Sequence, residues 1–127
     1  MATGISNYLA NAWLDALGNA TAFSVATPYV KLHIGDPGAN GTANAATEIT
    51  RKAVSFSAAS AGALASDADV TWTNILGSQD ATHFTAWDNL LVGNFLFSGT
   101  ITGNAYTAGD TYTISSGALT VSLTVAS

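Results

Sequence analysis

The first stretch with a clear hydrophobic period lies between Ile5 and Leu17. Its larger apolar residues recur every three or four positions, a spacing that places side chains on one face of a helix. They are Ile5, Tyr8, Leu9, Trp13, Leu14 and Leu17. Polar residues fall mostly on the opposite face, and Gly18 is a typical helix stop signal. The pattern predicts one amphipathic helix over residues 5–17.

Downstream of Gly18, the period of apolar positions changes to two, which is the period of a half-buried β-strand. Segments rich in β-branched and aromatic residues stand between clusters of Gly, Pro, Asn and Asp. The predicted strands are residues 29–34, 51–58, 70–73, 82–87, 94–101, 110–114 and 118–125.

Two strand pairings are expected from the turns between neighbouring segments. Residues 82–87 and 94–101 form the clearest pair, with a turn at 88–93. Residues 110–114 and 118–125 are predicted to form a hairpin. The inward-facing residues of its second strand are expected to be Leu119, Val121, Leu123 and Val125.

About seven short strands with regular turn signals predict a mainly β chain. We expect a single β-sandwich over about residues 25–127, with the N-terminal helix beside it. Jelly-roll and immunoglobulin-like topologies both alternate inward residues, so the pattern leaves both open. A length of 127 residues suits one domain, residues 1–127. Residues 35–47 combine turn signals with no large apolar residue, which predicts a long exposed loop.

The scarcity of charge limits the possible partners. Charged residues are 9% of the chain and the net charge is −5, whereas an ordinary domain is about 25% charged. Small residues (Ala, Gly, Ser and Thr) supply about half of the chain, so we expect a flat, weakly polar surface. Lys31, Arg51 and Lys52 are too few to neutralise a run of phosphates or bind an anionic bilayer. No nucleic acid and no membrane are expected as partners.

The absence of cysteine excludes disulfides, thiolate nucleophiles and Cys-based metal sites. The N-terminal stretch lacks the basic start and continuous apolar run of a secretory signal, and no apolar run is long enough to span a membrane. We therefore expect synthesis in the cytoplasm.

Candidate catalytic residues are few. His33 and His83 both fall in predicted strands, and no Gly-x-Ser-x-Gly elbow accompanies them, so we interpret both as strand-face residues. The glycines of residues 35–41 lack the register of a dinucleotide-binding loop. We expect no cofactor.

The acidic residues form no recognisable site either. Asp67 and Asp69 match no calcium-loop spacing, which favours a solvated turn and leaves a weak calcium site as the alternative. Eight acidic residues are enough to supply the carboxylate pair of a glycoside hydrolase, but no acid–base motif supports such a site. The sequence predicts no metal site and a protein that is not an enzyme.

Several segments, in order, resemble a family of small virion proteins of tailed bacteriophages. They are SNYLANAWLDAL, YVKLHIGDPG, TRKAVSFSAAS, THFTAWD, GNFLFSG and AGDTYTISSGALTVSL. Members of this family are labelled tail fibre, minor tail or head decoration proteins. The resemblance spans nearly the whole chain and implies a structural protein, made in the bacterial host cytoplasm and built into the virion.

The resemblance leads to two hypotheses. The first is a capsid decoration or minor capsid protein that binds the major capsid protein as a symmetric homo-oligomer, with a trimer favoured. The alternative is a minor tail or tail-fibre component that contacts tail proteins as an adaptor or host-adhesion module. In the second role Trp72 and Trp87 are candidates for glycan contact, although core packing is favoured for both.

The candidate partner-binding residues come from the helix and the long loop. The helix carries an apolar stripe with aromatic anchors of the kind that interfaces use, and the loop is expected to be exposed. The candidates are Ile5, Tyr8, Leu9, Trp13, Asp36, Pro37 and Asn40. Packing of the helix against the chain's own core is favoured over partner binding.

Overall fold

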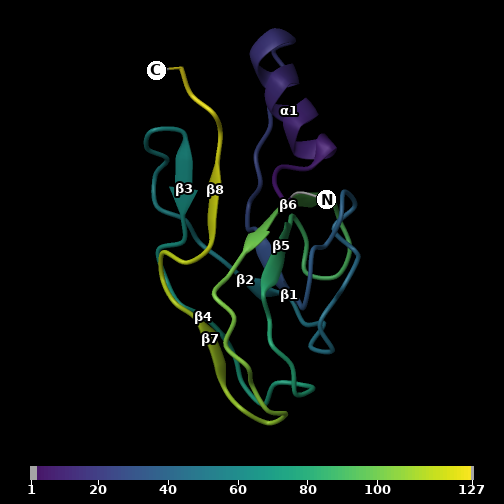
Figure 1. Cartoon of the computed structure of the whole chain (residues 1–127). Helices are drawn as coiled ribbons and strands as arrows, with labels where there is room; N and C mark the ends of the chain where they lie inside the picture. Colours follow the sequence, from purple (N-terminus) through teal and green to yellow (C-terminus); the bar gives the residue numbers. More distant parts are fainter. Residues whose placement is uncertain (1–2, 127) are drawn as a thin grey trace.

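The computed structural model describes residues 3–126, and the fold is mainly β (Figure 1). Within this range one α-helix comes first and eight short strands follow, all paired in antiparallel fashion. The elements are α1 (Asn7–Gly18), β1 (Tyr29–His33), β2 (Lys52–Ala53), β3 (Ala63–Ala65), β4 (Val70–Trp72), β5 (His83–Trp87), β6 (Phe95–Thr100), β7 (Tyr112–Ile114) and β8 (Thr120–Ser122). The predicted class, mainly β with one N-terminal helix, is confirmed.

The central sheet has the strand order β2-β1-β5-β6. Pairing of β5 with β6 confirms the clearest predicted pair. The residues just before α1 extend the β6 edge, since Ile5 forms an antiparallel bridge with Phe97. In addition, the Ser6 N–H donates to the Leu96 carbonyl at 2.8 Å. These contacts tie the start of α1 to the sheet.

The remaining strands form two ribbons, β3–β8 and β4–β7. Both belong to one long, irregular antiparallel pairing of residues 63–72 with residues 112–122, interrupted around Ser66. The predicted hairpin between residues 110–114 and 118–125 is therefore wrong. Both segments find their hydrogen-bond partners on the same distant stretch of chain instead of on each other.

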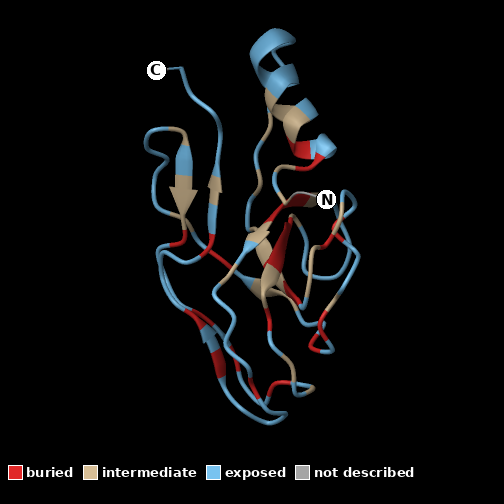
Figure 2. Cartoon of the chain, in the orientation of Figure 1, coloured by how far each residue is buried: buried red, intermediate tan, exposed pale blue. Residues whose placement is uncertain are grey.

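One hydrophobic cluster joins the sheet to the ribbons, an arrangement compatible with the predicted sandwich. Figure 2 shows its buried residues in β5, β6 and the β4–β7 ribbon, while most of α1 is exposed. Phe84 and Phe97 meet edge to face at 5.9 Å between ring centroids, and Trp72 packs on Tyr112 at 6.1 Å. Aromatic rings on the sheet and on the ribbon supply much of the core.

Three expectations about element bounds and faces are corrected. The helix begins at Asn7 rather than residue 5, because the Ser6 hydroxyl accepts the Leu9 N–H and caps it. The strand predicted over residues 51–58 shortens to β2, since the next residue in register opposite Val54 is Pro28, which accepts the Val54 N–H but has no N–H to return the bond. Leu123 and Val125 were expected inside but are about half exposed, because β8 ends at Ser122 and both lie beyond it.

The 35–47 loop contains neither helix nor strand and folds back onto the sheet. Pro37, Gly41 and Ala46 within it are buried. Gly41 lies against the ring of Phe95 with φ +72°, so a side chain has no room there. The loop is thus only partly exposed.

Candidate interaction surfaces

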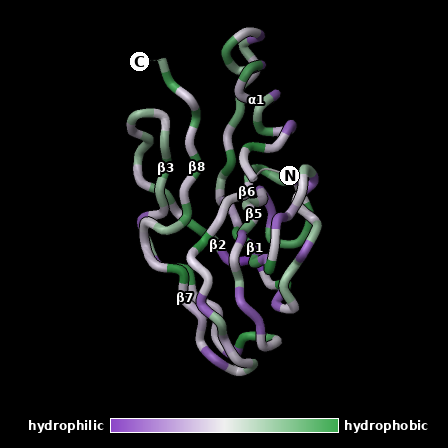
Figure 3. Tube along the Cα trace, viewed as in Figure 1, coloured by the Kyte–Doolittle hydropathy of each residue, from purple (hydrophilic) through white to green (hydrophobic). Residues whose placement is uncertain are grey.

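Helix α1 leaves half of its apolar stripe exposed to solvent, at Tyr8, Leu14 and Leu17. Leu9 is its one buried residue, whereas Leu14 and Leu17 are 63% and 84% exposed. Figure 3 shows hydrophobic positions alternating with hydrophilic ones along the helix. The helix is nevertheless held in place, because Tyr8 meets Phe23 of the returning chain edge to face at 6.2 Å. Its unpartnered apolar side is a candidate contact surface.

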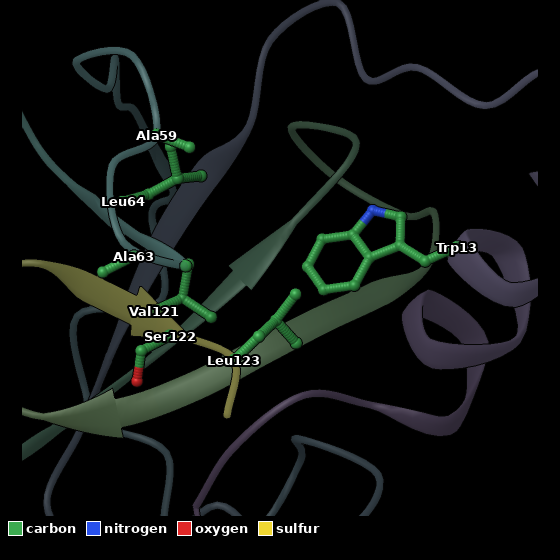
Figure 4. Close-up of a pocket in the computed structure, with 8 residues that line it drawn as sticks. Trp13, Ala59, Ala63, Leu64, Val121, Ser122 and Leu123 are labelled. Carbon is green, nitrogen blue, oxygen red and sulfur yellow. The ribbon is translucent and has the colours of Figure 1, made fainter. Parts of the chain in front are cut away.

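An apolar cleft separates α1 from the β3–β8 ribbon. Figure 4 shows the Trp13 indole on the helix side, facing Leu123 and Val121 across the cleft, with Leu64 and Ala59 farther along its wall. The cleft encloses about 160 Å³. None of its lining residues carries an ionisable side chain; they are Trp13, Ala59, Gly62, Ala63, Leu64, Val121, Ser122 and Leu123. We call this feature the α1–β8 cleft.

A second apolar surface lies on the 88–94 loop, which joins β5 to β6. Leu90, Leu91 and Val92 are adjacent in sequence and are 46%, 80% and 70% exposed. The sequence predicts a turn here, and the structure confirms that residues 88–93 connect the two strands. The functional signal that sequence reasoning missed is the run of three aliphatic residues inside an otherwise polar turn.

Hydrogen bonds hold the 88–94 loop in shape. Arg51 Nη1 donates to the carbonyls of Asn89 and Val92, at 2.8 and 2.7 Å. The Asp88 carboxylate accepts from the backbone N–H and the side-chain amide of Asn94, at 2.7 and 3.0 Å. The loop therefore presents its aliphatic side chains from an ordered backbone.

Arg51 also braces the sheet beneath the loop. Its guanidinium lies 4.2 Å from the ring centroid of Trp87, a cation–π arrangement. Partial burial lowers the pKa of Arg51 from its ordinary value, and the Asp88 carboxylate opposes that shift. The side chain stays charged and serves as a clamp between the sheet and the loop.

The candidate residues predicted from sequence divide between core and surface. Leu9 is buried, Ile5 and Trp13 are half-buried and pack against the core, and Tyr8 is exposed. In the loop, Pro37 is buried, Asn40 is exposed, and Asp36 accepts the Gly38 N–H at 2.8 Å.

A shallow pocket brings the two candidate segments together, since the stretch around Ile5 and the loop at Gly38 both line it. Trp13 lies instead in the α1–β8 cleft. The predicted residues thus do not form one surface.

His33 is fully buried, and both of its ring nitrogens have partners within the chain. Nδ1 lies 2.8 Å from the Ala43 carbonyl and Nε2 lies 2.9 Å from the Thr85 hydroxyl, which also accepts from Trp87 Nε1 at 2.7 Å. Burial is the main cause that lowers the pKa of His33. A neutral ring satisfies every one of these contacts and fastens the 35–47 loop to the sheet.

The other residues considered for chemistry are also occupied by the fold. Asp69 accepts the Ser116 N–H at 2.8 Å, and Asp67 accepts from the Ser55 hydroxyl. Trp72 and Trp87 are buried, so neither offers an open ring face for a glycan.

The described part of the chain also lacks a metal-binding cluster and a membrane-spanning helix. Across residues 3–126, no three His, Asp or Glu side chains gather as a metal-binding group. In the same range no helix has the length and apolar character needed to cross a bilayer.

Comparison with known proteins identifies a family. Residues 4–122 match the family described as "Podophage GP4 fiber I protein gp80". No curated protein matches the chain. The matched region includes α1, the central sheet, the ribbons and the 88–94 loop. Because the match spans nearly the whole chain, this protein belongs to the podophage fiber I protein family and is a structural component of the phage virion.

Proposed function

We propose that this protein is a non-enzymatic subunit of a tail fibre, held in the particle by apolar protein–protein contacts. The observation that carries the proposal is the exposed stripe of α1 on a helix whose start is fixed to the sheet. A family described as a fibre protein supports the same role. Anchored but uncovered apolar residues are typical of an interface.

The energetics favour docking through this stripe. Fully burying one leucine contributes about 1.5–3 kcal/mol, and Leu14 and Leu17 each have more than half of their surface still to bury. Burying both therefore supplies roughly 2–4 kcal/mol per contact. Asp15 is the one charged residue in α1, so little charge has to be desolvated. Repetition of such contacts along an assembly adds through effective concentration.

A non-enzymatic role is supported by how the reactive side chains are used. His33, Asp69 and Asp88 each have hydrogen-bond partners that fasten loops or turns. The α1–β8 cleft contains no titratable group that would act as an acid, base or nucleophile. Folding and assembly in the host cytoplasm are part of the proposal.

Capsid decoration is the second candidate function. The weakly charged, small-residue surface favours repeated contacts with a shell of major capsid subunits, and a trimeric cluster would multiply them. The family's description as a fibre protein favours the tail fibre. Both roles use the same helix face but differ in location on the particle.

The test is incorporation into virions. A phage lacking this gene is complemented with tagged wild-type protein, with Leu14→Asp/Leu17→Asp, with Trp13→Ala, or with the control Leu76→Asp. Leu76 is 52% exposed and lies outside α1. We expect the double Asp variant to be absent from particles, Trp13→Ala to be incorporated at a reduced level, and Leu76→Asp to be incorporated as well as wild type. Immunogold labelling of the tag should place the wild-type protein at the tail.

Circular dichroism first checks that every variant folds. Full incorporation of the folded double Asp variant would refute the role of the helix. Label spread over the head would favour decoration, and cleavage of host cell-wall polymers by the purified protein would contradict the non-enzymatic role.

A further inference from the structure

We propose that the 88–94 loop of one copy docks into the α1–β8 cleft of a second copy, so that this chain associates head to tail. The proposal deepens the fibre role and rests on it, because it names another copy of this protein as the partner. The two halves of the contact are both present on every chain.

The 88–94 loop has the properties of an inserting element. Leu91 is 80% exposed at its tip, flanked by Leu90 and Val92. The clamp by Arg51 and the turn bonds of Asp88 order the backbone before any contact forms. Little conformational entropy is then lost on binding, which is the usual advantage of a preorganised loop.

The α1–β8 cleft matches this element in size and chemistry. Its volume is about 160 Å³, and an apolar cavity of about 150 Å³ accommodates a benzene molecule. One leucine side chain fits a space of that size. The walls at Trp13, Leu64 and Leu123 are apolar, as is the side chain that would enter.

Charge does not oppose a second copy at these two surfaces. Each chain carries a net charge of −5, so association requires contact surfaces that avoid the acidic groups. The cleft has no ionisable lining residue, and Asp88 and Arg51 already have partners within the loop and its base. No unpaired charge has to be buried when these two surfaces meet.

The contact extends beyond one leucine. Leu17 lies one helical turn after Trp13 and is 84% exposed, and Val125 lies beside Gly62 at the cleft and is 53% exposed. A stable interface buries roughly 800 Å² per partner, and these residues enlarge the apolar area around the cleft toward that requirement.

The arrangement predicts how copies join. The loop and the cleft share no residue, and in Figure 1 the β3–β8 ribbon lies to the left of α1, whereas β5 and β6, which the loop joins, lie below it. A contact between two different surfaces is heterologous, so it leaves a free loop and a free cleft at the ends. Such contacts generate closed rings or filaments.

The experiment is sedimentation velocity on the purified chain with complementary variants. Leu91→Asp blocks the loop, and Leu123→Asp or Ala63→Asp blocks the cleft. The matched control is Leu76→Asp, another exposed leucine outside both surfaces. Wild type and Leu76→Asp should form species larger than dimers as concentration rises, whereas each blocked variant should stay monomeric.

The decisive experiment mixes a loop variant with a cleft variant. A Leu91→Asp chain keeps its cleft and an Ala63→Asp chain keeps its loop, so an equimolar mixture should form a 1:1 dimer and nothing larger. Thermal unfolding near that of wild type shows that each variant folds.

Monomeric wild type up to millimolar concentration, undiminished assembly of Leu91→Asp, or a mixture that stays monomeric would overturn the proposal. Any of these results would leave the fibre role standing, since the location and copy number of the wild-type protein in virions test that role separately.

Discussion

Acidification is expected to destabilise the fold through His33. The ring is 0% exposed, and its two nitrogens contact the Ala43 carbonyl and the Thr85 hydroxyl. A protonated ring must donate from both nitrogens, so the Thr85 hydroxyl would have to accept from His33 as well as from Trp87 and its own proton would lose the His33 nitrogen as acceptor. The neutral ring is therefore the form that the fold requires.

The sign and size of the effect follow from this preference. Burial, the largest cause, lowers the pKa of folded His33 below its ordinary value of 6.5, and the charges of Lys31 and His83 act in the same direction. As pH falls, the unfolded chain takes up the proton first, so stability is complete above pH 6.5 and declines below it. Because the folded pKa is lowered, this loss has an upper limit of about 1.4 kcal/mol at pH 5.5, or roughly 4–8 °C in Tm.

The assay is thermal unfolding by circular dichroism at pH 7.5, 6.5 and 5.5, a range above most carboxylate titration. Wild type and the control His83→Gln should both lose stability across it. His33→Gln should be less stable at pH 7.5, because it loses buried hydrogen bonds, but its Tm should change little with pH. An equal pH dependence in His33→Gln and wild type would refute the reasoning.

Three further variants test the contacts that shape the loops. Glu48→Ala should cost about 1–3 kcal/mol in urea unfolding, because the buried Glu48 carboxylate accepts the N–H groups of Leu76 and Thr50 and the variant leaves both without this acceptor; a loss equal to that of Glu48→Gln would contradict this. Gly41→Ala should cost about 1–3 kcal/mol, since its Cβ would lie 2.6 Å from Phe95, and more than Gly117→Ala, which has open space at a similar φ. Arg51→Met should speed hydrogen exchange in the 88–94 loop while global stability falls by only about 1 kcal/mol, and unchanged loop exchange would argue against the clamp.

Local patterns predicted the elements that depend on neighbouring residues. The helical spacing and the Gly18 stop located α1 to within two residues, and the short polar turn after Trp87 identified β5–β6. The hairpin failed because alternation shows which residues point inward but not which strand pairs with which. The true partner, residues 63–72, lies in a stretch where Leu64 is the one large apolar residue before Val70, so it looked like loop.

The interaction surfaces were predicted only in part for a similar reason. Trp13 and Tyr8 stand out in sequence as aromatic anchors, and both reach the surface. The α1–β8 cleft joins Trp13 to residues about 50 and 110 positions away, which only the fold brings together. Leu91 was hidden inside a predicted turn, although a run of apolar residues in a turn is itself a signal.

The most direct test of the fibre role is the copy number of this chain relative to the major capsid protein in purified, washed virions, measured by quantitative mass spectrometry. A fibre subunit predicts a small, fixed number of copies per particle. A ratio near a simple fraction of the shell copy number would contradict the fibre and favour decoration of the head. Absence of the chain from the virion would contradict both structural roles.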